Sequence, residues 1–286
     1  MIPTRRWIAG LALALCAQAQ PVRIVSTFPS VTETLFALGA GDHVVGVSNY
    51  CHYPPAVLSL PKVGTYMKPD PEKIALLRPD LVIIQDQAVG LADRLSALGI
   101  RHVGVKVGSL AEVYSMIRDI GKAVALPEQA ERLNSDIRAR LDGFRAEASG
   151  KPRPHVLLIV GRTPGILTNL IGVGSNAYLG ELLEIAGASN VLKGTAIAYP
   201  PISMETVVRL NPDIILDSSM MGEAGANPGP MQELLRQPWL THHELLAVRN
   251  GTVFGLATES LVTPGPRVVE AVAAIRNKLV EKGRPQ

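Results

Sequence analysis

The chain has 286 residues, of which 47% are hydrophobic and 19% are charged, and its formal net charge is +3. This length and composition suffice for two ordinary hydrophobic cores. The Lys and Arg residues are scattered among acidic residues, so the sequence lacks the basic patch that nucleic-acid binding requires.

The first residues have the three parts of a secretory signal. Arg5 and Arg6 supply positive charge, an apolar run follows, and residues 17–19 (Ala-Gln-Ala) offer a small-residue cleavage site. We therefore expect residues 1–19 to be a signal peptide of a periplasmic or other extracytoplasmic protein. The arginine pair leaves twin-arginine export open, and Cys16 leaves a lipid anchor open. Loss of Cys16 on cleavage would leave Cys51 without an intramolecular partner, so we expect the mature chain to be held by its core.

Short β-branched runs then alternate with helical patterns along the whole chain. This alternation predicts an α/β fold with parallel sheets covered by helices, and the uninterrupted apolar runs are typical of strands buried on both faces. The predicted strands are 23–26, 44–47, 81–84, 102–105, 155–160, 214–217 and 252–255. The predicted helices are 31–38, 71–77, 90–98, 110–125, 176–185, 204–210, 230–236 and 266–282.

A segment of different character separates the two halves. Pro127 and Glu128 suit the first turn of a helix, and Gly150 and Pro152 end it. Apolar residues recur in between at spacings of three and four, which predicts one long amphipathic helix. We therefore expect two Rossmann-like lobes, 20–126 and 150–286, joined by a linking helix over 127–149. A single helix of this kind favours limited opening of the lobes.

The two halves also repeat one motif. Three residues of the first half match three of the second at one constant separation: Tyr66 with Tyr199, Glu72 with Glu205, and Asp80 with Asp213. Two related units at this distance indicate two similar lobes rather than an array of small repeats. Two lobes form a cleft, and clefts between domains are common ligand sites.

Glu72 and Glu205 each lie in the first turn of a predicted short helix. An acid at this position can simply favour the helix, by about 0.3–1 kcal/mol. Because the acid occurs at matching places in both halves, we expect the two carboxylates on one outer face. That arrangement suits a symmetric partner with two basic pockets.

Motifs for catalysis are missing from the sequence. It contains no Gly-x-Ser-x-Gly elbow, no Walker loop and no complete dinucleotide fingerprint. The histidines are dispersed, so we expect no metal site.

Several segments together resemble one family. The segments 23–33 and 45–55, with the two Glu-to-Pro-Asp motifs, are similar to the periplasmic binding proteins of ABC importers for cobalamin, haem and ferric siderophores, and most closely to the vitamin B12-binding members. The resemblance covers essentially the whole mature chain. It implies two lobes joined by one helix, a monomer, no catalysis, and docking of Glu72 and Glu205 onto arginines of a permease dimer that works with its ATPase.

The resemblance also implies a ligand site. Positions similar to the family's cleft residues are Tyr50, Tyr66, Tyr199 and Glu259, and Arg162 is a further candidate for contact with a ligand carboxylate or phosphate. The alternative for each tyrosine is an ordinary loop position. Where the family's site carries tryptophan this chain has tyrosine, residues 166–167 lack the expected phenylalanine, and Thr263 stands in place of an arginine. His52, beside Tyr50, could touch a bound macrocycle or lie on the surface.

We therefore expect a binding protein without a resident cofactor, whose transported ligand is cobalamin or a related corrinoid. Haem or a ferric siderophore is the alternative. An enzyme on a similar scaffold, such as a tetrapyrrole chelatase or a nitrogenase-like reductase, is disfavoured by the export signal and the single mature cysteine. A binding module that serves a sensor instead of a transporter is a third possibility.

Overall fold

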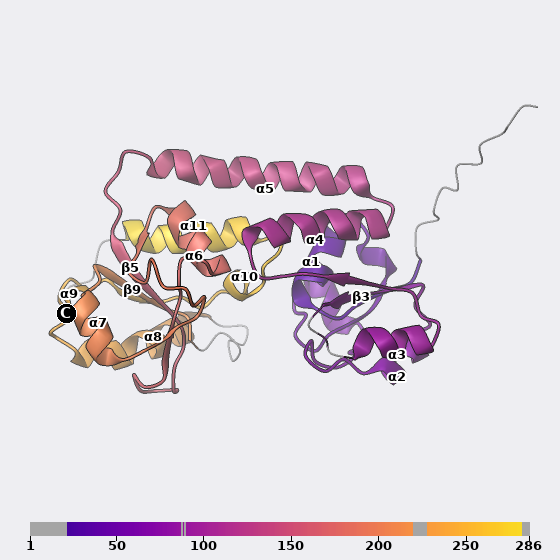
Figure 1. Ribbon diagram of the computed structural model, residues 1–286, viewed down its shortest axis with the longest axis horizontal. Helices are drawn as coiled ribbons and strands as arrows, with labels where there is room; N and C mark the ends of the chain where they lie inside the picture. Colours follow the sequence, from indigo (N-terminus) through magenta and orange to yellow (C-terminus); the bar gives the residue numbers. More distant parts are fainter. Residues whose placement is uncertain (1–21, 87, 89, 220–227, 282–286) are drawn as a thin grey trace, which may run out of the picture.

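The computed structural model describes residues 22–86, 88, 90–219 and 228–281. It contains two α/β lobes, each built around its own sheet and connected by one long helix, as Figure 1 shows. The predicted fold class is therefore confirmed. The expected signal peptide, with Cys16, lies outside the described residues. Within those residues, no helix combines the length and apolar character needed to cross a membrane.

The first lobe contains a four-stranded sheet in the order β2-β1-β3-β4, with every neighbouring pair parallel. Its strands are β1 (Ile24–Ser26), β2 (Val44–Val47), β3 (Leu81–Gln85) and β4 (His102–Val105). Its helices are α1 (Pro29–Ala37), α2 (Pro71–Leu76), α3 (Leu91–Ala97) and α4 (Leu110–Ala123). All residues of β1 and β3 are buried, as their apolar runs predicted.

The second lobe contains a sheet in the order β10-β9-β5-β6-β8, and β7 also pairs with β5. Its strands are β5 (His155–Gly161), β6 (Leu170–Gly172), β7 (Ser189–Asn190), β8 (Pro201–Ile202), β9 (Ile214–Asp217) and β10 (Val253–Gly255). Its helices are α6 (Tyr178–Ala186), α7 (Met204–Leu210), α8 (Pro228–Arg236), α9 (Leu246–Arg249), α10 (Glu259–Val262) and α11 (Val268–Val280). The expectation of parallel pairing is wrong for β6 and β8, which are antiparallel to their neighbours.

The duplication seen in the sequence is a duplication of topology. The order β2-β1-β3-β4 of the first lobe recurs in the second as the parallel arrangement β7-β5-β9-β10. The repeated aspartates have equivalent roles. Asp80 Oδ2 accepts hydrogen bonds from the backbone N–H of Val22 (3.0 Å) and Arg23 (2.9 Å), and Asp213 Oδ2 accepts one from His155 N–H (2.8 Å). Each aspartate therefore holds the start of the first strand of its lobe.

Helix α5 (Pro127–Ala148) connects the lobes with 22 residues, a length of roughly 33 Å. Its buried face consists of Ala130, Asn134, Ile137 and Leu141. This face packs on α4 of the first lobe and on α6 and α11 of the second, and Figure 1 shows α5 running above all three. The helix therefore braces both lobes along its length.

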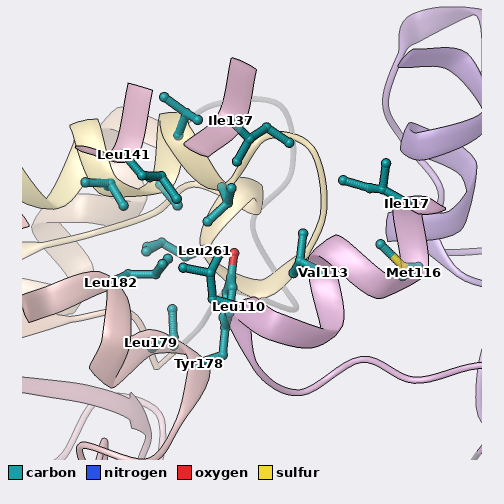
Figure 2. Packing of buried hydrophobic residues seen from close by; sticks show 14 of the residues in the cluster. Leu110, Val113, Met116, Ile117, Ile137, Leu141, Tyr178, Leu179, Leu182 and Leu261 are labelled. Carbon is teal, nitrogen blue, oxygen red and sulfur yellow. The ribbon is translucent and has the colours of Figure 1, made fainter. Parts of the chain in front are cut away.

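One hydrophobic core crosses the junction between the lobes. Figure 2 shows Leu110 and Val113 of α4 beside residues of the second lobe: Tyr178, Leu179 and Leu182 of α6 and Leu261 of α10. The junction also carries a polar contact, because Glu181 Oε1 accepts a hydrogen bond from Leu110 N–H at 3.1 Å. Apolar burial at about 25 cal/mol per Å² opposes separation of the lobes, which favours limited opening.

Candidate functional site

Aromatic side chains of the first lobe gather in the loops that follow its strands. Phe28 follows β1, Tyr50 follows β2, and Tyr66 lies in the next long loop. The Tyr66 ring makes edge contacts with both others, at centroid distances of 5.3 Å to Phe28 and 5.4 Å to Tyr50. The carboxyl ends of parallel strands are the usual ligand edge of such a sheet. Of the predicted residues, Tyr50 and Tyr66 are thus brought together.

Tyr50 presents much of its ring to solvent, with 46% of the residue exposed. Phe28 and Tyr66 are half-buried; Tyr66 contacts Tyr50 directly, and Phe28 contacts Tyr66. Sequence reasoning did not assign Phe28 to the site, and its place directly after the first strand was the signal available. The three rings meet edge to face, at interplanar angles of 83° and 63°, and we call this cluster the aromatic platform. Aromatic rings combine large area with little conformational freedom, so such a cluster can cover apolar surface of a ligand.

Tyr199 is the predicted site tyrosine of the second lobe. It lies just before β8 and is 45% exposed, while burial of the rest of the side chain raises its pKa. The pKa of Tyr178, in the interlobe core, is raised by burial and further by the nearby carboxylate of Glu33. Tyr199 is therefore a partly exposed aromatic side chain of the second lobe.

A buried ion pair crosses from lobe to lobe beside this region. Arg267 contacts Glu33 with two hydrogen bonds, Nη2 to Oε1 at 2.5 Å and Nε to Oε2 at 3.0 Å. The two side chains are only 14% and 3% exposed, and the Arg267 guanidinium lies 4.1 Å from the centre of the Tyr53 ring. Burial raises the pKa of Glu33 even though Arg267 opposes the shift. Burial alone would lower the pKa of Arg267, but the Glu33 hydrogen bond and the nearby carboxylates raise it.

A second, more exposed pair also joins the lobes. His52 Nδ1 lies 3.0 Å from Glu259 Oε1, and the side chains are 51% and 39% exposed. The other carboxylate oxygen of Glu259 is 3.9 Å from Arg267 Nη2. Glu259, a predicted site residue, therefore meets the first-lobe turn that carries Tyr50 and Tyr53.

The proposed ligand contact of Arg162 is wrong. Its side chain and that of Asp217 are both fully buried, with Arg162 Nε donating to Asp217 Oδ2 at 2.8 Å. The other guanidinium nitrogens donate to backbone carbonyl groups of the same lobe, and Trp239 Nε1 also donates to Asp217 Oδ2, at 2.7 Å. The Arg162 side chain is therefore buried in the core of the second lobe and is not available to a ligand.

The arginine that joins the two lobes is Arg267, which the sequence analysis did not consider. Thr263, the position at which the resemblance implies an arginine, is 6% exposed. Arg267 lies four residues further along, directly before α11, and reaches the first lobe. Local pattern gave no indication of this contact, since Arg267 and Glu33 are 234 residues apart.

Glu72 and Glu205 are both exposed and both lie in the first turn of their helices. The helix starts are capped by other side chains, Asp70 for α2 and Ser203 for α7. In the described part of the chain neither glutamate takes part in an ion pair. Figure 1 shows α2 and α7 in different lobes, both on the side of the molecule away from α5. Their docking role stays a prediction.

The fold defines a class of protein: two-lobed binding proteins whose lobes are linked by one long helix. A family model for periplasmic binding proteins matches residues 24–259. The chain belongs to this family, as its sequence motifs predicted, and the family consists of substrate-binding transport proteins. In the described residues, no group of three or more His, Cys, Asp or Glu side chains is placed to hold a metal ion.

Individual relatives cover nearly the whole chain. The ABC transporter substrate-binding lipoprotein YvrC of Bacillus subtilis is 29% identical over 270 residues, which is 91% of this chain and 80% of the relative. A vitamin B12-binding protein of Vibrio cholerae serotype O1 is 29% identical over 255 residues, covering 88% of this chain and 87% of the relative.

Solved structures show the same fold. The periplasmic vitamin B12 binding protein BtuF of Vibrio cholerae is 27% identical with a TM-score of 0.71, over 91% of this chain and 97% of that chain. A periplasmic heme binding protein from Pseudomonas aeruginosa is 26% identical with a TM-score of 0.74, over 93% and 95% of the two chains.

Proposed function

We propose that this protein is an extracytoplasmic solute-binding protein that captures cobalamin or a related corrinoid between its lobes and delivers it to an ABC importer. Its role is binding and not catalysis. The proposal depends above all on one observation, the aromatic platform of Phe28, Tyr66 and the exposed Tyr50 in the first lobe, with the exposed Tyr199 in the second.

The exposed tyrosine surface is large enough to matter for affinity. Tyr50 is 46% exposed and Tyr199 is 45% exposed. For an aromatic side chain of roughly 200 Å² this leaves about 90 Å² each, and covering that area contributes about 2 kcal/mol per ring at about 25 cal/mol per Å². Two such rings on opposite lobes suit the two faces or edges of a corrin.

The names of relatives support the class of ligand and the partner. The Vibrio cholerae matches, by sequence and by structure, bind vitamin B12 by name, and the Bacillus subtilis relative is an ABC transporter substrate-binding lipoprotein. In this proposal Glu72 and Glu205 dock the monomeric protein onto a permease dimer with its ATPase. Export would depend on residues 1–19.

Haem is the second candidate. A structural relative is a heme binding protein by name, and tyrosine and histidine side chains of the kind found around Tyr50 and His52 are common ligands of haem iron. The aromatic platform of Phe28, Tyr50 and Tyr66 does not by itself distinguish a porphyrin from a corrin.

Titration of the purified protein with cyanocobalamin, haemin and a ferric siderophore, followed by visible spectroscopy and calorimetry, tests the proposal. We expect saturable one-to-one binding of cyanocobalamin, weakened about thirtyfold by Tyr50→Ala. Tyr114→Ala is the matched control, because this tyrosine lies on α4 against Arg138. Binding of haemin alone would replace the corrinoid, chemical conversion of the macrocycle would favour an enzyme, and binding of none of the three would refute the proposal.

A further inference from the structure

The His52–Glu259 pair has features that simple bracing of the lobes does not require. His52 lies on the turn after β2, between the buried Cys51 and the exposed Tyr53, and its side chain is half exposed. We propose that His52 coordinates the metal centre of the macrocyclic cargo through Nε2. This inference rests on the proposed function, and His52 is not part of the aromatic platform.

The pairing with Glu259 determines which ring nitrogen is available. A carboxylate can only accept a hydrogen bond, so the 3.0 Å contact requires the proton of the neutral ring on Nδ1. Nε2 then carries the free lone pair. In the described residues Nε2 has no hydrogen-bond partner, and 51% of the side chain is accessible.

Glu259 is itself held in place from the second lobe. Its other oxygen is 3.9 Å from Arg267 Nη2, and Arg267 is fixed by two hydrogen bonds to the buried Glu33 and by the Tyr53 ring. A carboxylate that accepts the Nδ1 proton orients an imidazole and raises its basicity, which is the usual outer support of a metal-ligating histidine.

The position also fits the platform. Tyr50 and Tyr53 are 46% and 43% exposed, while Cys51 between them is turned inward against Thr32 and Ser48. From this turn His52 and Tyr53 contact Glu259 and Arg267 of the second lobe, while Tyr50 contacts Tyr66 of the platform. A macrocycle that covers this turn brings its central metal close to His52.

The chemistry is a simple ligand exchange. With aquocobalamin, the Nε2 lone pair forms a bond to cobalt(III) and the bound water leaves, without any electron transfer. With ferric haemin, Nε2 forms a bond to the iron and the chloride, hydroxide or water that it replaces leaves, again without electron transfer. Imidazole suits both metals, so cobalt and iron macrocycles are two sources of one ligand chemistry.

Spectroscopic titration with aquocobalamin, cyanocobalamin and haemin separates these cases. In cyanocobalamin, cyanide occupies the cobalt position that exchangeable water occupies in aquocobalamin. Binding of cyanocobalamin therefore measures the affinity of the cleft without coordination by His52, and aquocobalamin measures the additional effect of coordination. We expect a nitrogen-ligation shift in the visible spectrum of bound aquocobalamin, or of bound haemin if the cargo is haem. In His52→Ala this shift should vanish and the preference for aquocobalamin over cyanocobalamin should fall at least tenfold, and added imidazole should restore the shift. Glu259→Gln should weaken the shift.

His155→Ala is the matched control, because His155 also pairs with a carboxylate, Asp213 Oδ2 at 3.4 Å, and is 68% exposed. It should behave as the wild type. If cyanocobalamin binds but neither aquocobalamin nor haemin shows a shift that depends on His52, the coordination is refuted and the proposed function stands. If none of the three macrocycles binds, both are refuted.

Discussion

The buried pair between Glu33 and Arg267 gives the sharpest stability prediction. Glu33→Ala removes the carboxylate from a guanidinium that is only 14% exposed and leaves its charge without its main partner. Breaking a buried pair on one side typically costs 3–5 kcal/mol. Arg267 keeps its stacking on Tyr53 and the more distant carboxylates of Glu259 and Glu270, so we expect a loss near the lower end, about 3 kcal/mol.

Urea denaturation and thermal melting followed by circular dichroism measure this loss. For a chain of this size about 3 kcal/mol corresponds to a fall in melting temperature of roughly 6–12 °C. Replacing both partners together by methionine should cost less than Glu33→Ala alone, because no charge is then left buried. Glu128→Ala is the control, since Glu128 is 83% exposed and pairs with Arg132 within one helix.

A Glu33→Ala variant whose unfolding free energy lies within about 0.5 kcal/mol of the wild type would refute the reasoning. That result would mean that Arg267 regains its hydration at no cost, and that the interlobe pair does not hold the lobes together.

Three further predictions concern docking, the shared core and pH. The double variant Glu72→Ala, Glu205→Ala should abolish import while the affinity for the macrocycle stays unchanged; unchanged import would favour a sensor. Leu182→Ala should cost about 3–4 kcal/mol because Leu182 is fully buried at the lobe junction, whereas Leu76→Ala, at an 82% exposed position, should cost less than about 0.5 kcal/mol. Because burial raises the pKa of Glu33, the native state binds this proton more tightly than the unfolded state does. The resulting stability is complete below about pH 4.3, the pKa of an unfolded glutamate, and is lost as the pH rises through the native pKa. The unfolding free energy of the wild type minus that of Glu33→Gln should therefore fall as the pH rises above about 4.3, and a flat difference would contradict this.

Local sequence patterns predicted most of the fold. The helix over Pro127–Ala148 follows from its apolar spacing and its flanking prolines, and the buried strands β1, β3 and β9 follow from uninterrupted apolar runs. Strands β6 and β8 have three and two residues, too few to show an alternating pattern, so their antiparallel pairing was not foreseen.

The site was harder to predict because its contacts join distant parts of the chain. Repetition marks Tyr66 and Tyr199 as equivalent positions without any structure, and their role in ligand binding stays a prediction. The His52–Glu259 contact spans 207 residues, and no local rule reports such a distance. Arg162 was misjudged for the same reason, because its partner Asp217 lies 55 residues away in the neighbouring strand.

The claim that one macrocycle contacts both lobes is tested most directly by the affinity of cyanocobalamin for two single variants, Tyr66→Ala in the first lobe and Tyr199→Ala in the second. We predict that each weakens binding at least tenfold, with unfolding curves that show both variants to be folded. If only one of the two variants loses affinity for cyanocobalamin, the ligand does not lie between the two lobes, and the account is contradicted.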